Sequence, residues 1–341
     1  MQLTEGISAV IPVYNSSGTL EPLMARLERC LAALSPSFEI ILVNDGSRDD
    51  SWSVITSLSE RYGCLRGINL MRNYGQHNAL LVGIQQARFD TTVTLDDDLQ
   101  NPPEEMGKLI EKLREGYDVV YGTPARESHG LWRDLASQAT KLALQSAMGA
   151  ETARNVSAYR AFRTQVREGF RQYSSPDVSI DVLLTWATTK FAAIPVRQDA
   201  RAVGVSNYTV RRLITHALNM TTGFSMLPLQ LASVVGFAFT TFGLAILAYV
   251  VVRYFTVSQG VPGFPFLASM IAIFSGAQLF ALGIIGEYLA RMYFRNMGRP
   301  YAVIRQTVDQ TIDQAVAPES LDRLRTAATT EQTAIRRAGA A

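Results

Sequence analysis

The stretch from Leu213 to Ala290 is almost free of charge, and this feature limits most strongly what the chain can fold into. Only Arg253 and Glu287 are charged among these 78 residues, whereas the chain's average of 18% predicts about 14 charges. Such a stretch suits the hydrocarbon of a bilayer. Two segments within it, at about 227–252 and 264–288, each exceed the roughly 20 residues that a membrane-crossing helix needs. Core helices of a soluble protein, the alternative, would normally show a polar face.

Arginines at the ends of the two segments predict their orientation. Arg211 and Arg212 precede the first segment, four arginines follow the second between residues 291 and 305, and only Arg253 lies between the two segments. Positively charged residues collect on the cytoplasmic side of membrane helices. The pattern therefore predicts a multi-pass protein whose N-terminal part and both chain ends are cytoplasmic.

The same division predicts four parts. They are a soluble head at 1–207, an amphipathic segment at the headgroup level at 208–226, two membrane helices within 227–290 and a cytosolic tail at 291–341. No aromatic residue follows Tyr301, and the tail is rich in Gln, Thr, Ala and charged side chains. It is therefore predicted to be flexible after residue 305.

The composition argues against two classes of function. Lys and Arg total 32 against 30 Asp and Glu, and a net charge of +2 without a long basic run disfavours a nucleic-acid partner. The two cysteines, Cys30 and Cys64, do not have the spacing of metal ligands, and a chain of this size needs no disulfides for stability. A reducing compartment fits best.

The head alternates apolar runs with amphipathic segments. Residues 7–13 have the pattern of a buried strand, and leucines recur at helical spacing over 19–34. The order of strand, polar loop and helix then repeats from Glu39, from Arg66 and from Thr91. This alternation predicts an α/β head with a mainly parallel, doubly wound, Rossmann-like sheet.

Ligands of such a sheet bind beyond the carboxyl ends of the strands. The polar residues expected at that edge are Asn15 and the segments 44–50, 72–76 and 96–100. Asp96, Asp97 and Asp98 would repel one another there unless a cation or hydrogen-bond donors offset their charge. Oxygen ligands of this kind favour Mg²⁺ or Mn²⁺. Capping of the helix that opens near Pro102, the alternative, explains one acid and not three.

Asp45 and Arg72 are further candidates at the same edge. Asp45 could accept hydrogen bonds from a nucleobase or ribose, or it could belong to an ordinary turn with Gly46 in a left-handed conformation. Arg72 could donate to a phosphate, with Gly75 allowing close approach of the backbone. The chain contains no GxGxxG, GxxxxGKS/T, GxSxG or HExxH motif, which disfavours dehydrogenase, P-loop, serine-hydrolase and zinc-protease functions.

Taken together, these motifs resemble those of the family 2 glycosyltransferases, which have the GT-A fold. VIPVYN, ILVNDGS, RNYGQH and TLDDDLQNPPEE follow the order and spacing of that family. The resemblance continues through SAYRAFR, RAVGVSNY and the second apolar segment, and it covers about residues 7–305. It is strongest to the polyprenyl-phosphate glycosyltransferases.

The resemblance implies inverting transfer of a sugar from a nucleotide diphosphate-sugar, with a UDP-sugar favoured, to a membrane polyprenyl phosphate, with undecaprenyl phosphate favoured. It also implies Mg²⁺ or Mn²⁺ as cofactor and a place in the bacterial inner membrane. The product would serve cell-envelope glycans or lipids. A homo-oligomer such as a tetramer is a further expectation from the resemblance alone.

Together with the predicted sheet edge, the resemblance assigns roles to particular residues. Those expected to bind the nucleotide-sugar are Pro12, Tyr14, Asn15, Asp45, Arg72, Asp96 and Asp97. Those expected to hold the metal are Asp98 and Gln100, and those expected to meet the acceptor phosphate are Arg126, Arg133, Arg160 and Arg201. The expected catalytic residues are Asp96, Asp97, Arg160 and Arg201. For Arg126 and Arg133, an ordinary solvated surface position is an equal alternative.

Three residues depart from the family pattern: Asp97 stands where Ala is usual, Ala158 where Gly is expected, and Asn207 where Lys is expected. The first adds a negative charge near the donor, and the last removes a cation near the acceptor phosphate. Two other functions stay open. A processive polysaccharide synthase normally carries a QxxRW motif and more membrane segments, and an inactive membrane-tethered nucleotide-sugar binder would show binding without turnover.

Overall fold

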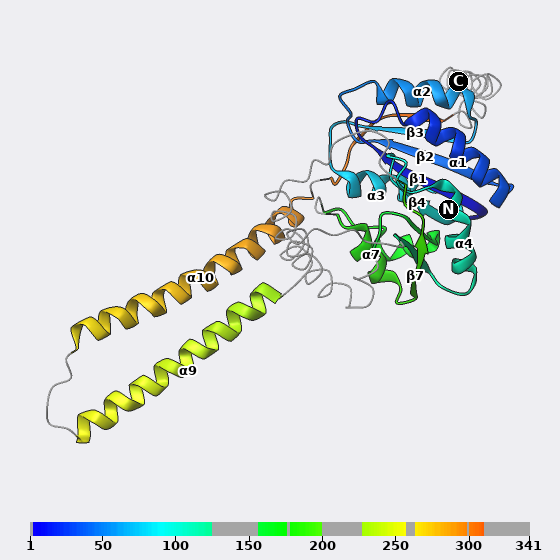
Figure 1. The fold of residues 1–341 in the computed structure, drawn as a ribbon. Coiled ribbons are helices and arrows are strands. Elements are labelled where there is room, and N and C mark those ends of the chain that lie inside the picture. The colour runs from blue at the N-terminus through cyan, green and yellow to red at the C-terminus, as the bar shows by residue number, and fades with distance from the viewer. Residues whose placement is uncertain are drawn as a thin grey trace, which may run out of the picture.

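The computed structural model describes residues 3–124, 156–175, 178–199, 227–256, 263–298 and 300–309. Within them, an α/β head carries two long helices that extend together away from one side of it (Figure 1). Arg126, Arg133, Arg201, the amphipathic segment 208–226 and the tail beyond 309 lie outside the described residues.

One eight-stranded sheet forms the centre of the head, in the order β7-β5-β6-β4-β1-β2-β3-β8. The strands are β1 (Thr4–Val13), β2 (Phe38–Asn44), β3 (Leu65–Leu70), β4 (Phe89–Thr94), β5 (Val119–Pro124), β6 (Arg160–Arg163), β7 (Phe191–Val196) and β8 (Ile304–Asp309). Strands β4, β1, β2 and β3 pair in parallel, whereas β6 and β8 run antiparallel to their neighbours. The predicted α/β class is confirmed, with a mixed sheet that is parallel at its centre.

Helices cover both faces of the sheet. Helices α1 (Leu20–Leu34), α2 (Ser51–Arg61) and α4 (Met106–Arg114) pack on one face, and α3 (Gln76–Gln86) with α7 (Ile180–Ala187) on the other. Along β1 the side chains alternate between the two layers, so that Ile11 is buried in the first and Val10 in the second. The sequence predicted helices α1 to α4, because their apolar residues recur at helical spacing.

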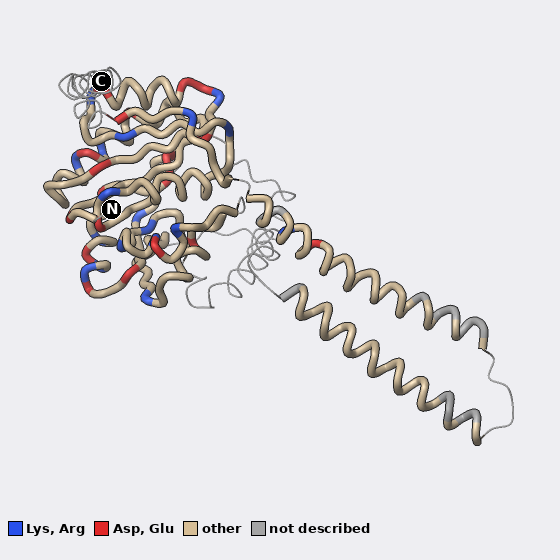
Figure 2. Tube along the Cα trace, turned by 180° about the vertical axis from the view of Figure 1, so that it is seen from behind, with Lys and Arg blue, Asp and Glu red and all other residues tan. Residues whose placement is uncertain are grey.

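Two helices follow the head, α9 (Leu227–Thr256) and α10 (Phe264–Asn296). They contain the candidate membrane spans Leu229–Tyr249 and Ile273–Tyr293, of which 6% and 0% is buried. That exposure is unlike the core helix of a soluble protein and fits attachment to a membrane. Figure 2 shows the charged residues concentrated on the head and almost missing from the described parts of the two helices.

Both helices are longer than predicted. Helix α9 passes the expected end at residue 252, and α10 passes residue 288. Glu287 and Arg291 form an ion pair of 2.8 Å one turn apart on α10. A helix continues readily beyond the apolar segment when its polar side chains pair in this way.

The tail differs from the prediction as well. Flexibility after residue 305 was expected, but this is wrong as far as Asp309, because Ile304–Asp309 forms β8 beside β3. The carboxylate of Asp309 accepts hydrogen bonds from Arg66 at 2.9 Å and from Arg88 at 2.6 Å. A polar sequence can therefore join the sheet because its charges meet partners far away in the chain, which the local composition does not reveal.

Candidate active site

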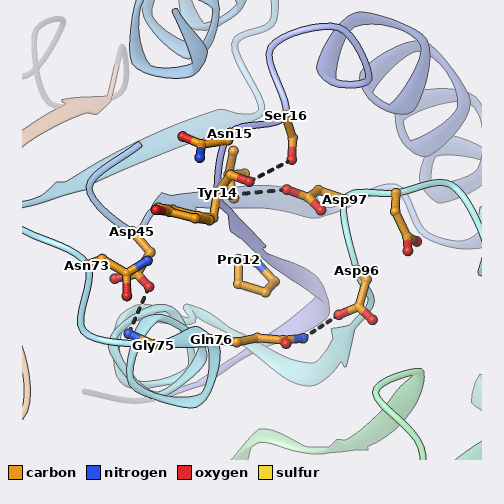
Figure 3. Close-up of a pocket in the computed structure, with 12 residues that line it drawn as sticks. Pro12, Tyr14, Asn15, Ser16, Asp45, Asn73, Gly75, Gln76, Asp96 and Asp97 are labelled. Carbon is orange, nitrogen blue, oxygen red and sulfur yellow. Dashed lines mark hydrogen bonds between the residues drawn. The ribbon is translucent and has the colours of Figure 1, made fainter. Parts of the chain in front are cut away.

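A pocket of about 390 Å³ lies at the carboxyl ends of the central strands (Figure 3). Seven of the residues predicted for donor or metal binding line it: Pro12, Tyr14, Asn15, Asp45, Asp96, Asp97 and Asp98. They come from the ends of β1, β2 and β4, which are neighbours in the sheet. The sequence therefore predicted where these side chains meet, since parallel strands end at one edge.

The loop after β1 is held by the loop after β2. The side-chain oxygen of Asn15 accepts a hydrogen bond from the backbone of Arg48 at 2.8 Å, and the Asn15 backbone N–H donates to Ser47 at 3.0 Å. Asn15 has a φ of 55°, in the left-handed region that Asn tolerates better than most residues. In this structure Asn15 thus shapes the rim of the pocket through its neighbours, while the side chain of Tyr14 remains 42% exposed.

Asp45 holds the loop that follows β3. Its two carboxylate oxygens accept hydrogen bonds from the backbone N–H groups of Tyr74 at 2.7 Å and Gly75 at 2.8 Å. Asp45 is only 2% exposed, and burial raises the pKa of its carboxyl despite these two bonds. The side chain that was expected to meet the nucleotide also fixes the pocket wall opposite the acidic segment.

Gly46 makes that arrangement possible. It has a φ of 62°, and a Cβ atom there would lie 2.6 Å from the backbone nitrogen of Asn73. Only glycine allows the two loops to approach this closely without strain. The turn with a left-handed Gly46 and the binding role of Asp45, weighed as alternatives from the sequence, are therefore compatible.

The three adjacent acids have different surroundings. Asp96 accepts a hydrogen bond from the side-chain amide of Gln76 at 2.6 Å, and Asp97 accepts one from the backbone of Tyr14 at 3.2 Å. Asp98 accepts from the backbone of Gln100 at 3.1 Å. Between them, Leu99 adopts a φ of 62° that turns the chain sharply after Asp98. Donors from three segments offset part of the repulsion expected among neighbouring carboxylates.

The position of Asp97 affects its ionisation. Burial raises the pKa of its carboxyl, and the neighbouring charge of Asp98 adds to the rise. Hydrogen bonds from the Ser16 side chain and the Tyr14 backbone act in the opposite direction. These contacts place Asp97 against the loop after β1, on the wall of the pocket.

The residues that could hold a divalent cation are Asp96 and Asp98. No group of three or more His, Cys, Asp or Glu side chains converges on one point among the residues that the structure describes. Two carboxylates suit Mg²⁺ or Mn²⁺, because such ions usually complete their shell with water and substrate phosphates. Gln100 does not line the pocket, and its backbone carbonyl accepts a hydrogen bond from Asp199 at 2.9 Å.

Arg160 requires a correction. It was expected to meet the acceptor phosphate, but its side chain is 1% exposed and forms a buried ion pair with Asp181. Its guanidinium also donates to Thr94 at 3.0 Å, at the end of β4 and two residues before Asp96. In this structure Arg160 binds the end of the strand that precedes the acids, and it is not among the residues that line the pocket.

Arg72 is exposed and does not line the pocket. Its guanidinium lies 4.3 Å from the centre of the Tyr74 ring, a cation–π contact. The electrostatic influence of Arg72 nevertheless reaches the carboxyl of Asp45, whose pKa it acts to lower. A phosphate role for Arg72 stays a prediction, as do the roles of the three arginines outside the described residues.

Sequence reasoning did not assign roles to three polar residues of the pocket, Ser16, Asn73 and Gln76. Each lies one to four residues from a residue that was singled out, so proximity to the motifs was the available signal. Asp181 was missed altogether. It lies in the first turn of an apolar helix, where acidic residues are common because they interact favourably with the helix dipole.

The fold and the pocket define the class of the protein: a GT-A sheet with an acidic edge, typical of glycosyltransferases. The family model described as Glycosyl transferase family 2 matches residues 8–170. An undecaprenyl-phosphate 4-deoxy-4-formamido-L-arabinose transferase of Pseudomonas aeruginosa (strain UCBPP-PA14) is 36% identical over 321 residues, which cover 93% of this chain and 94% of that protein. The chain belongs to glycosyl transferase family 2.

A second relative agrees with that assignment, and a solved structure shows a similar fold. A protein of the same name from Klebsiella pneumoniae (strain 342) is 34% identical over 307 residues, which cover 89% of this chain and 94% of that protein. Glucosyl-3-phosphoglycerate synthase from Mycobacterium tuberculosis, solved with Mn²⁺, UDP and phosphoglyceric acid, has a TM-score of 0.48 and 18% sequence identity. That match covers 64% of this chain and 76% of the solved chain.

Proposed function

We propose that this glycosyltransferase transfers a sugar from a nucleotide diphosphate-sugar, with UDP as the favoured nucleotide, to undecaprenyl phosphate or a similar polyprenyl phosphate. The observation that carries the proposal is the position of the pocket relative to the membrane helices. The backbone N–H of Met71, next to the pocket loop, donates to Val303 at 2.9 Å. Val303 follows the end of α10 at Asn296 by only seven residues, which supports a pocket edge on the side of the head nearest the bilayer.

A lipid acceptor fits that position. Its phosphate lies at the headgroup level, where a pocket beside the membrane helices can meet it without extraction of the isoprenoid chain. Similarity to the undecaprenyl-phosphate transferases covers 93% of this chain and so includes the helices as well as the head. A soluble acceptor would not explain why the head is joined to two long apolar helices.

The pocket also suits a nucleotide-sugar donor. Its volume of about 390 Å³ lies in the range of sites for small molecules and cofactors. The exposed ring of Tyr14 offers a surface for stacking of a base, and Asp45 lies near the Asn73–Gly75 backbone, across the pocket from Asp96. The donor diphosphate would then extend toward the acids at the end of β4.

Asp96 and Asp98 would hold a Mg²⁺ or Mn²⁺ ion there, with the diphosphate supplying further oxygens. Such an ion offsets the negative charge of the departing nucleoside diphosphate. Asp97, held by the Tyr14 backbone, orients the loop against which the donor packs. None of these residues needs to take a proton from the acceptor.

The acceptor is already a nucleophile at neutral pH. Phosphate monoesters have a second pKa near 6, so the attacking oxygen is mostly anionic. The protein therefore has to align that oxygen behind the anomeric carbon and to neutralise charge. Arg126, Arg133 and Arg201 stay the predicted partners of the phosphate. One displacement inverts the anomeric centre.

Purified protein in detergent, undecaprenyl phosphate, Mn²⁺ and a panel of labelled UDP-sugars test the proposal. Labelled lipid of inverted anomeric configuration is the expected product. A long polymer would instead identify a processive synthase, and tight donor binding without product would identify an inactive binder. A product that keeps the donor's anomeric configuration would contradict the single displacement.

A further inference from the structure

The segment after the second long helix contacts the start of a loop that lines the pocket. Strand β8 pairs antiparallel with β3, with Ile304 opposite Leu70 at the carboxyl end of β3. The chain continues from Leu70 directly into Met71 and the loop of Arg72 to Gly75. Residues from opposite ends of the chain therefore meet where this loop begins.

Met71 is held on both sides of its backbone by that segment. Its N–H donates to the carbonyl of Val303 at 2.9 Å, and its carbonyl accepts from the guanidinium of Arg305 at 3.0 Å. A charged donor makes the second bond the stronger type, although Arg305 is exposed and water competes for it. Tyr301 and Ala302 add apolar contacts to the layer that also includes Tyr74.

The far end of the loop is held by the loop after β2, because the carboxylate of Asp45 accepts hydrogen bonds from the backbone N–H groups of Tyr74 and Gly75. The loop of residues 71–75 is thus fixed at its start by the C-terminal segment and at its end by Asp45. Gln76, which follows immediately, binds the acid Asp96. A shift at the start of the loop would displace groups on the pocket wall, because only four residues lie between Met71 and Gln76.

We infer that Arg305 is a positioning residue for the donor site: by holding the Met71 carbonyl, it keeps the loop of residues 71–75 in the conformation that binds the nucleotide-sugar. The inference rests on the proposed function for the identity of the ligand. Arg305 follows the second long helix in sequence, far from the rest of the head, yet it would support the donor site. Arg305 is not among the residues that line the pocket.

The first measurement does not depend on any ligand. Amide hydrogen exchange of the full chain in detergent is compared between the wild type, Arg305→Ala and Arg305→Lys, for peptides that cover residues 71–76. Exchange should be several-fold faster in Arg305→Ala and near the wild-type rate in Arg305→Lys, since lysine keeps a charged donor. Arg61→Ala is the matched control, because it also removes an exposed arginine, paired with Glu21 on the head surface.

The second measurement is the affinity for UDP with Mn²⁺, by calorimetry, together with the donor KM and kcat. Arg305→Ala should weaken UDP binding and raise the donor KM about three- to tenfold, as expected for loss of one solvent-exposed charged hydrogen bond. We expect kcat at saturating donor and the melting temperature to stay near wild type, and Arg305→Lys to recover most of the affinity.

Four outcomes distinguish failure of this inference from failure of the proposed function. Unchanged exchange in Arg305→Ala would overturn the inference, and so would faster exchange with unchanged UDP affinity. A wild-type protein that binds no UDP at all would count against the proposed donor, while the exchange data would still decide whether Arg305 orders the loop. An equal loss in Arg61→Ala would show that the effect is unspecific.

Discussion

Three neighbouring carboxylates at the end of β4 differ in what surrounds them, and these differences predict how each would respond to substitution. Asp96 binds the Gln76 amide, and Asp97 is buried against the Tyr14 backbone. Asp98 lies at the turn that Leu99 makes with its φ of 62°. The three side chains are identical and adjacent in sequence, but their environments differ, so we expect their functions to differ.

Asp98→Ala should remove turnover while the head stays folded. The substitution takes away one of two carboxylates proposed to hold the cation, whose effect on the leaving diphosphate is worth several kcal/mol, roughly, in the transition state. Gln100→Ala should be milder, because its side chain does not line the pocket. Initial rates against Mn²⁺ concentration measure the effect, with the exposed Asp50→Ala as control. Near-normal rates of Asp98→Ala in metal-depleted buffer would refute the metal assignment.

Asp97→Asn should retain measurable activity and stabilise the ligand-free protein at neutral pH. Burial raises the pKa of Asp97 in the folded state, so the folded protein holds this proton more tightly than the unfolded chain does. Stability is therefore lost as pH rises through the folded pKa, and Asn avoids that loss while its oxygen still accepts from Tyr14. The gain in melting temperature should shrink as pH falls toward 4. Activity as low as that of Asp98→Ala, with unchanged metal binding, would show that Asp97 has a chemical role.

At the level of secondary structure, the sequence predicted the strands and helices that a local pattern of apolar residues encodes. Apolar periodicity predicted β1 to β4 and helices α1 to α4, and the parallel order brought the ends of β1, β2 and β4 to one pocket. The pattern could not predict β8, because four of its six residues are polar and its partners lie in β3. It also could not reveal that Arg160 pairs with Asp181, because a buried charge is recognised only when its partner is known.

Asp309→Asn should lower the free energy of unfolding of the head by about 1–3 kcal/mol. The Asp309 side chain is 6% exposed and accepts from Arg66 and Arg88, so its neutralisation leaves two guanidinium groups with Glu39 as the remaining nearby acid. Chemical denaturation in detergent measures the change. Glu21→Gln, which removes a pair with Arg61 on the surface, should cost less than about 0.5 kcal/mol. Equal losses in both variants would show that β8 is not stabilised by this charge cluster.

For the whole molecule, the arginines flanking the two helices predict the orientation that we propose in the bilayer. Reporters fused before Met1 and after Ala341 should both be cytoplasmic, and a tag near Gln259 should be accessible from the opposite side. Accessibility of single cysteines to a membrane-impermeant reagent provides the measurement. If the tag at Gln259 were protected from outside while both ends were cytosolic, the two helices would have to enter the bilayer without crossing it.

The pairing of β8 with β3 also orders events during synthesis. The contact between Met71 and Arg305 spans 234 residues, so the ribosome completes the head and both apolar helices before the last strand exists. Until then the edge of β3 has no partner, and an unpaired edge strand invites association with other chains. A nascent chain acquires its complete sheet only once its translation has passed the membrane helices. The sheet of the head can therefore be completed only after both apolar helices have been synthesised.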